Sequence, residues 1–141
     1  TYNLTNTTYA NAGIAFLDKY ESDFRQDYHD SCIHYCDEAI KKSFDYGIPY
    51  AVKLCAYSID IKRGLTDMEK QAATDEIKKI FNQVRYTKSS YIAKELVERL
   101  DQSRTSFLKD YIEDLDKLFP AEMKELKDRV EPPPAPETAT A

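Results

Sequence analysis

The amino-acid sequence predicts an all-α protein, and three observations support that prediction. The 141 residues include only three glycines, and four of the six prolines lie between residues 132 and 136. A sheet protein needs a turn signal about every 8 to 12 residues, which this chain does not supply. Apolar residues instead recur three, four or seven apart, as amphipathic helices require. We therefore expect an antiparallel bundle of five to six helices, with a long helix near the C-terminus and an extended proline-rich tail.

The length fits a single domain. We expect a polar N-terminal segment over residues 1–7, a helical bundle domain over 8–131 and an extended tail over 132–141. The tail has four prolines and no large apolar side chain, so it has nothing to pack into a core.

The first predicted helix begins at about Thr8, and its apolar residues form one stripe with three aromatic residues beside it. The stripe is Ala10, Ile14, Leu17, Phe24 and Tyr28, and the adjoining residues are Tyr9, Phe16 and Tyr20. A second periodic set follows at Ile33, Cys36, Ile40 and Phe44. Only the polar cluster from Asp27 to Ser31 suggests a break between these sets, so one long helix is the alternative.

The clearest predicted corner lies at Gly47 and Pro49. Gly47 suits a left-handed residue after a helix, and Pro49 suits the first turn of the next helix. This third helix carries Tyr50, Leu54, Tyr57 and Ile61 on one stripe. We expect it to end at Lys62-Arg63-Gly64, where glycine can adopt a positive φ.

A capping box predicts where the fourth helix starts, because Thr66 and Glu69 can bond to each other's amides. Its expected core stripe is Ala73, Ile77, Ile80, Phe81 and Val84. No strong helix breaker marks the end of this helix. We expect it near Thr87 to Ser90, where hydroxyl side chains can cap a helix.

A fifth helix has nearly heptad spacing and should run for roughly 28 residues, or about 40 Å. Its apolar residues are Ile92, Leu96, Leu100, Phe107, Tyr111, Leu115 and Leu118. Phe119 and Pro120 should end it and begin a short final helix. That helix carries Met123, Leu126 and Val130.

One cluster has the side chains of a metal site. If its stretch is helical, His29, Cys32 and Cys36 share a face while His34 points elsewhere, and Cys55 could supply a fourth zinc ligand. The spacing misses the standard zinc templates, and buried free cysteines are common in cores. We therefore expect no cofactor, with zinc as the alternative.

Composition limits the other functions. The net charge is -5, and the 20 basic residues are interspersed among 25 acidic ones rather than clustered as a phosphate-binding surface requires. We do not expect nucleic-acid binding, although Lys41-Lys42, Lys62-Arg63 and Lys78-Lys79 could form basic patches. No apolar stretch approaches the ~20 residues of a membrane span, so we expect no transmembrane segment.

The cysteine count bears on the compartment. A disulfide framework normally has an even and larger number of cysteines than the three in this chain, so reduced thiols are expected. We predict an intracellular, cytoplasmic protein and leave organellar and viral assemblies open.

Catalytic motifs are missing, and tyrosine is in excess. The chain has no glycine-rich phosphate loop, G-x-S-x-G elbow or H-E-x-x-H motif, so we do not expect an enzyme. The 11 tyrosines point to protein contacts, because a phenol combines a large rigid surface with a polar group. The sequence therefore predicts a non-enzymatic interaction or structural subunit of a multi-protein assembly, with a protein partner or with self-association. Candidate contact residues lie off the core stripes: Tyr9, Tyr20, Tyr35, Tyr46, Tyr86 and Tyr91.

Overall fold

The computed structural model describes residues 5–44, 46–64, 66–86 and 113–130. Over these residues all regular structure is helical, which confirms the predicted fold class for this part of the chain. The helices are α1 (Asn6–Asp23), α2 (Gln26–Lys42), α3 (Ile48–Arg63), α4 (Asp67–Tyr86) and α7 (Pro120–Val130). Residues 113–118 are also helical. Most of the predicted fifth helix, the tail and Tyr91 lie outside the described residues.

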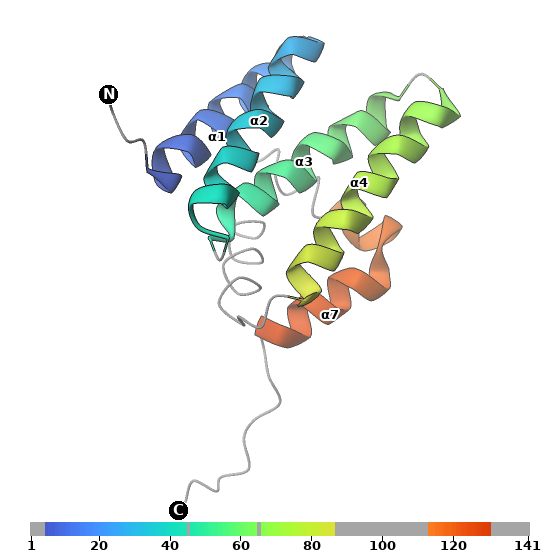
Figure 1. Cartoon of the computed structure of the whole chain (residues 1–141). Helices are drawn as coiled ribbons and strands as arrows, with labels where there is room; N and C mark the ends of the chain where they lie inside the picture. Colours follow the sequence, from blue (N-terminus) through green and yellow to red (C-terminus); the bar gives the residue numbers. More distant parts are fainter. Residues whose placement is uncertain (1–4, 45, 65, 87–112, 131–141) are drawn as a thin grey trace, which may run out of the picture.

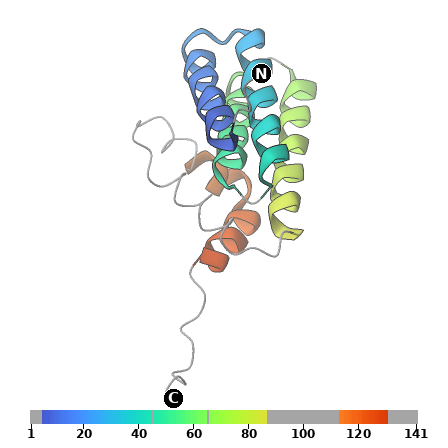
Figure 2. The same ribbon diagram turned by 60° about the vertical axis from the view of Figure 1, so that its left-hand side comes forward.

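Helices α1 and α2 lie side by side as a hairpin (Figures 1 and 2). Helix α1 begins two residues before the expected Thr8, because the Thr5 hydroxyl accepts a hydrogen bond from the Thr8 amide at 3.2 Å and caps the helix. Gly13 lies where the two helices approach closely. A Cβ atom built on it would be 2.8 Å from Sγ of Cys36, so the close packing requires glycine there.

The break between α1 and α2 lies at Phe24 and Arg25, and the prediction of a break from Asp27 to Ser31 is wrong. Those residues belong to α2. Phe24 adopts left-handed backbone angles, φ 54° and ψ 32°, and its amide donates to the Tyr20 carbonyl at 2.8 Å. Asp27 instead supports the start of α2, where it accepts from Arg25 and from the Tyr28 amide.

The buried stripes of this hairpin are shifted from the predicted ones. Three predicted core residues are exposed to a considerable degree: Ile14 at 36%, Phe24 at 46% and Phe44 at 65%. Small residues allow the helices to approach, so the contact forms along them rather than along the largest apolar side chains. The buried residues are Ala10, Gly13, Leu17 and Tyr20 in α1, and His29, Cys32, Cys36 and Ala39 in α2.

Helix α3 is the central helix. Every residue from Tyr50 to Ala56 is buried, so α3 packs on all sides rather than along one predicted stripe. Pro49 lies in its first turn, as expected. Gly47 is not left-handed, however: its φ is -75°, and its carbonyl accepts from the Ala51 amide as the residue before the helix.

A tight turn joins α3 to α4. Helix α3 ends at Arg63 as predicted, but Gly64 has a φ of -56° rather than a positive value. Space favours glycine there, because an added Cβ would lie 2.6 Å from Cγ of Lys70 and 3.0 Å from the Asp60 carbonyl oxygen, so the lysine side chain would have to move. The predicted cap of α4 is present: the Glu69 amide donates to the Thr66 hydroxyl oxygen at 3.1 Å. The Glu69 carboxylate accepts from that hydroxyl, not from the Thr66 amide.

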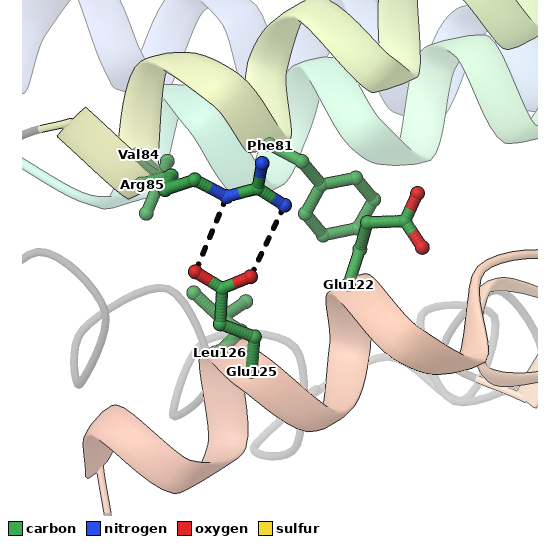
Figure 3. Close-up of a pocket in the computed structure, with 6 residues that line it drawn as sticks. All are labelled: Phe81, Val84, Arg85, Glu122, Glu125 and Leu126. Carbon is green, nitrogen blue, oxygen red and sulfur yellow. Dashed lines mark hydrogen bonds and ion pairs between the residues drawn. The ribbon is translucent and has the colours of Figure 1, made fainter.

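Helix α4 uses its predicted stripe, since Ala73, Ile77, Ile80, Phe81 and Val84 are all buried. Pro120 begins α7 as expected, and Met123 and Leu126 are buried. Figure 3 shows how α4 and α7 meet: Arg85 binds both carboxylate oxygens of Glu125, at 3.2 and 3.1 Å. The rings of Phe81 and Phe119 lie 5.8 Å apart beside this pair.

None of the helices in the described ranges has both the length and the apolar character needed to cross a membrane. The recess between α4 and α7 in Figure 3 encloses only about 10 Å³, which holds no more than one water molecule. It carries no functional candidate.

Candidate functional site

A cleft of about 410 Å³ separates the α1–α2 hairpin from the α3–α4 hairpin. Figures 1 and 2 show that both hairpins turn at this end of the molecule. The volume falls within the usual range for ligand pockets in proteins. Its lining combines aromatic rings with charged groups: Tyr20, Phe24, Gln26, His29, Tyr57, Asp60, Arg63, Gly64, Glu69, Ala72, Ala73 and Glu76.

Phe24 lies at the edge of the cleft. Its left-handed backbone is unusual for a residue with a bulky side chain, and such a conformation costs roughly 1–2 kcal/mol. The ring stays half-exposed, and the Arg63 guanidinium carbon lies 4.7 Å from its centroid. The hairpin therefore holds an apolar ring in contact with solvent at a strained position, which is typical of functional sites.

An ion pair in the lining of the cleft connects the two hairpins. Nε2 of His29 in α2 lies 2.7 Å from Oδ2 of Asp60 in α3. The approach is too oblique for a well-formed hydrogen bond, so the attraction is mainly ionic. Nδ1 of His29 lies 3.4 Å from an Asp30 carboxylate oxygen. Because carboxylates face both ring nitrogens, the site favours the imidazolium form of His29.

Tyr20 ties α1 into the same network. Its hydroxyl donates to Oδ1 of Asp60 in a short hydrogen bond and accepts from Nη1 of Arg63 at 3.1 Å. The side chain is only 1% exposed. Asp60 therefore contacts one residue from each helix of the first hairpin, Tyr20 and His29.

The pKa values in the cleft reflect this arrangement. Burial alone would lower the pKa of His29, but its contacts with Asp60 and Asp30 together raise the pKa above the ordinary 6.5. Burial and the hydrogen bond to Asp60 raise the pKa of Tyr20 to about 12. Burial, followed by the nearby carboxylates of Glu76, Asp37 and Asp60, raises the pKa of Tyr57. Burial and the nearby carboxylates together therefore set the pKa values of these three groups.

Helix α4 forms the opposite wall. Glu69, Ala72, Ala73 and Glu76 have the i, i+3, i+4, i+7 spacing that places residues on one helical face. The two alanines have short side chains, so the centre of this wall is recessed, and a carboxylate lies at each end. Glu69 belongs to the helix cap, and Glu76 pairs with Lys79 at 3.0 Å.

The predicted thiol cluster is buried in the hairpin contact. Cys32, Cys36 and Cys55 are free thiols within the core, and His34 is exposed on the other side of α2. His29 faces Asp60. Within the described residues no three His, Cys, Asp or Glu side chains are grouped as a metal site.

The candidate contact tyrosines have different environments. Tyr9 and Tyr35 are half-buried and stack across α1 and α2, with centroids 6.2 Å apart. Tyr46 is half-buried between α2 and α3. Tyr20 is a core residue rather than a surface one, because its hydroxyl bonds to Asp60 and Arg63. Tyr86 ends α4, and its side chain lies outside the described part, as does Tyr91.

The basic pairs of the nucleic-acid hypothesis are partly neutralised. Lys41 pairs with Glu38, Lys62 with Asp114, and Lys79 with Glu76. Each predicted patch therefore has a carboxylate beside it, which weakens an attraction to phosphate.

Sequence reasoning missed most of the cleft. From the sequence, Arg63 is expected near a helix end and Glu69 in a helix cap, and nothing singles out Asp60. Only the short side chains of Ala72 and Ala73, which end at Cβ on the same face as Glu69 and Glu76, could have suggested an open wall between charges.

The described residues form an all-helical fold with a charged aromatic cleft between two hairpins. Comparisons with protein-family models, with curated proteins and with solved structures find no match to this chain.

Proposed function

We propose that this protein is a non-enzymatic helical interaction subunit that binds a segment of another protein in the cleft between its two hairpins. The observation that carries this proposal is Phe24. A strained, half-exposed ring at the edge of a cleft provides apolar contact area at no further ordering cost.

The lining supports binding better than catalysis. The His29–Asp60 pair could serve as an acid–base dyad, but both Asp60 oxygens and both His29 nitrogens face internal partners. Among the described residues lining the cleft there is no serine, threonine or cysteine nucleophile beside His29. The network therefore holds the walls in place.

The proposal includes the architecture expected from the sequence, an antiparallel bundle with a long helix near the C-terminus, as the frame of an assembly subunit. It also includes a cytoplasmic location and no cofactor. Zinc on the thiols is the alternative, and metal analysis of protein purified without a tag distinguishes the two.

Site-specific photo-crosslinking tests the proposed function. A benzoylphenylalanine at position 24 should form a crosslink to one defined polypeptide in an extract of the source cells. The same residue at position 44 is the control, because Phe44 is also exposed but lies at the other end of α2. Light scattering of the purified protein shows whether the crosslinked partner is a second copy of the chain.

Two results would contradict the proposal. One is equal crosslinking from positions 24 and 44, which would indicate nonspecific contact. The other is no crosslink at position 24 from a protein that is also strictly monomeric.

A further inference from the structure

We propose that the partner places a basic side chain, lysine or arginine, in the cleft, between the glutamates of α4 and the aromatic wall opposite. This inference rests on the proposed function, since it names the chemistry of the segment that the cleft would receive.

The wall formed by α4 suits a long cationic side chain. Glu69 and Glu76 are two helical turns apart, or about 10 Å along the axis at 1.5 Å per residue. Ala72 and Ala73 between them have no side-chain atoms beyond Cβ that would block the approach. An aliphatic stem can therefore lie over the alanines while its charged end reaches a carboxylate.

Helix α3 adds aromatic surface to the cleft. Tyr57 lines the cleft half-buried, and its hydroxyl makes no hydrogen bond to any residue in the described ranges. The protein already holds one cation against such a ring here, because Arg63 stacks on Phe24. Aromatic faces attract lysine and arginine, which makes the wall compatible with a second cation.

The charges favour a cation over an anion. The lining has three carboxylates, on Asp60, Glu69 and Glu76, against the guanidinium of Arg63 and the imidazole of His29. Arg63 donates to Tyr20 and His29 pairs with Asp60, whereas the carboxylates of Glu69 and Glu76 each contact a single side chain, Thr66 and Lys79 respectively. The raised pKa of Tyr57, caused first by burial and then by Glu76, agrees with a negative potential at this wall. An acidic segment would be repelled there.

Titration of the isotope-labelled protein with blocked amino acids tests the inference by NMR. The probes are the N-acetyl methylamides of lysine, arginine, norleucine and glutamate. The lysine and arginine probes should shift the amide signals of residues lining the cleft, such as Tyr57, Ala72 and Glu76. The norleucine and glutamate probes should shift them far less, because one lacks the charge and the other reverses it.

Two neighbouring residues provide a matched pair of variants. Glu76→Lys reverses a charge in the cleft, whereas Asp75→Lys makes the same change on an exposed position of α4 that does not line it. We expect Glu76→Lys to lower the affinity for the lysine probe roughly tenfold. Asp75→Lys should leave that affinity within about twofold of the parental value. Circular dichroism melting shows whether both variants are folded.

Three results would overturn the inference: equal shifts from lysine and norleucine, stronger binding of glutamate, or equal losses in the two variants. If position 24 still crosslinks to a partner, the proposed function stands and only the basic ligand is wrong. If the lysine probe binds the cleft but no crosslink forms, the cation site stands and the protein-binding function is wrong.

Discussion

Nε2 of His29 and Oδ2 of Asp60 lie 2.7 Å apart and form an ion pair between the two helical hairpins. His29 belongs to α2 and Asp60 to α3, and Asp60 also accepts from Tyr20 of α1. A single carboxylate, that of Asp60, therefore links α3 to both helices of the first hairpin. Substitutions in this network should therefore lower the free energy of unfolding, whereas substitutions on the cleft walls should mainly weaken binding.

Stability should fall as the pH rises through the folded-state pKa of His29. That pKa is raised above the unfolded value of 6.5, because the contacts with Asp60 and Asp30 outweigh burial. The contribution is thus fully present below pH 6.5 and is lost at higher pH. Urea unfolding at a series of pH values measures it, and His29→Gln should remove this part of the dependence. A His34→Gln control should keep it, and an unchanged profile in His29→Gln would refute the role of the ion pair.

Tyr20→Phe should lower the free energy of unfolding by about 1–3 kcal/mol, because it removes the part-buried hydrogen bond that the Tyr20 hydroxyl donates to the Asp60 carboxylate. The ring stays, so core volume hardly changes. Tyr35→Phe is the control, since Tyr35 packs by stacking on Phe16 and Tyr9. Urea unfolding compares the two, and equal small losses would show that the Tyr20 hydroxyl does not stabilise the fold.

Gly13→Ala should destabilise the protein by about 1 kcal/mol or more, because the new Cβ meets Sγ of Cys36. This loss should exceed the gain of up to ~1 kcal/mol that alanine brings to a helix. In a Cys36→Ala background the clash is absent, so Gly13→Ala should become neutral or stabilising. A double-mutant cycle measures the coupling, and strictly additive effects would mean that α1 and α2 are not in contact at this point.

Phe24→Asn should change the free energy of unfolding by less than ~1 kcal/mol. Asparagine tolerates left-handed backbone angles better than phenylalanine does, and this relief of strain offsets the loss of the ring contacts. Partner capture should nevertheless fall severalfold. Thermal melting and a pull-down with the crosslinked partner measure the two effects. Full capture by a folded Phe24→Asn protein would show that the ring does not contact the partner.

The sequence predicted those elements whose signals are local. Pro49, Pro120 and the Thr66–Glu69 cap act within a single turn, and all three mark helix starts as expected. The stripe of α4 was also predicted, because only one of its faces is buried.

The turn at Phe24 and the cleft depend on tertiary contacts. Phenylalanine carries no signal for a left-handed residue, so the polar cluster from Asp27 gave the wrong boundary. His29 and Asp60 are far apart in sequence, and the contact between them exists only because α2 packs on α3. Tyr20 lies off the expected stripe and is therefore a candidate contact residue from the sequence, because periodicity does not show its bonds to Asp60 and Arg63 of α3.

Filling the cleft tests the central claim most directly. Ala72→Trp places a large ring on the α4 wall, and Ala15→Trp places the same ring on an exposed position of α1 that does not line the cleft. Calorimetry with the partner identified by crosslinking should show binding to Ala15→Trp at parental affinity, and binding to Ala72→Trp at least tenfold weaker. Parental affinity in a folded Ala72→Trp protein would contradict the claim that the cleft between the hairpins is the binding site.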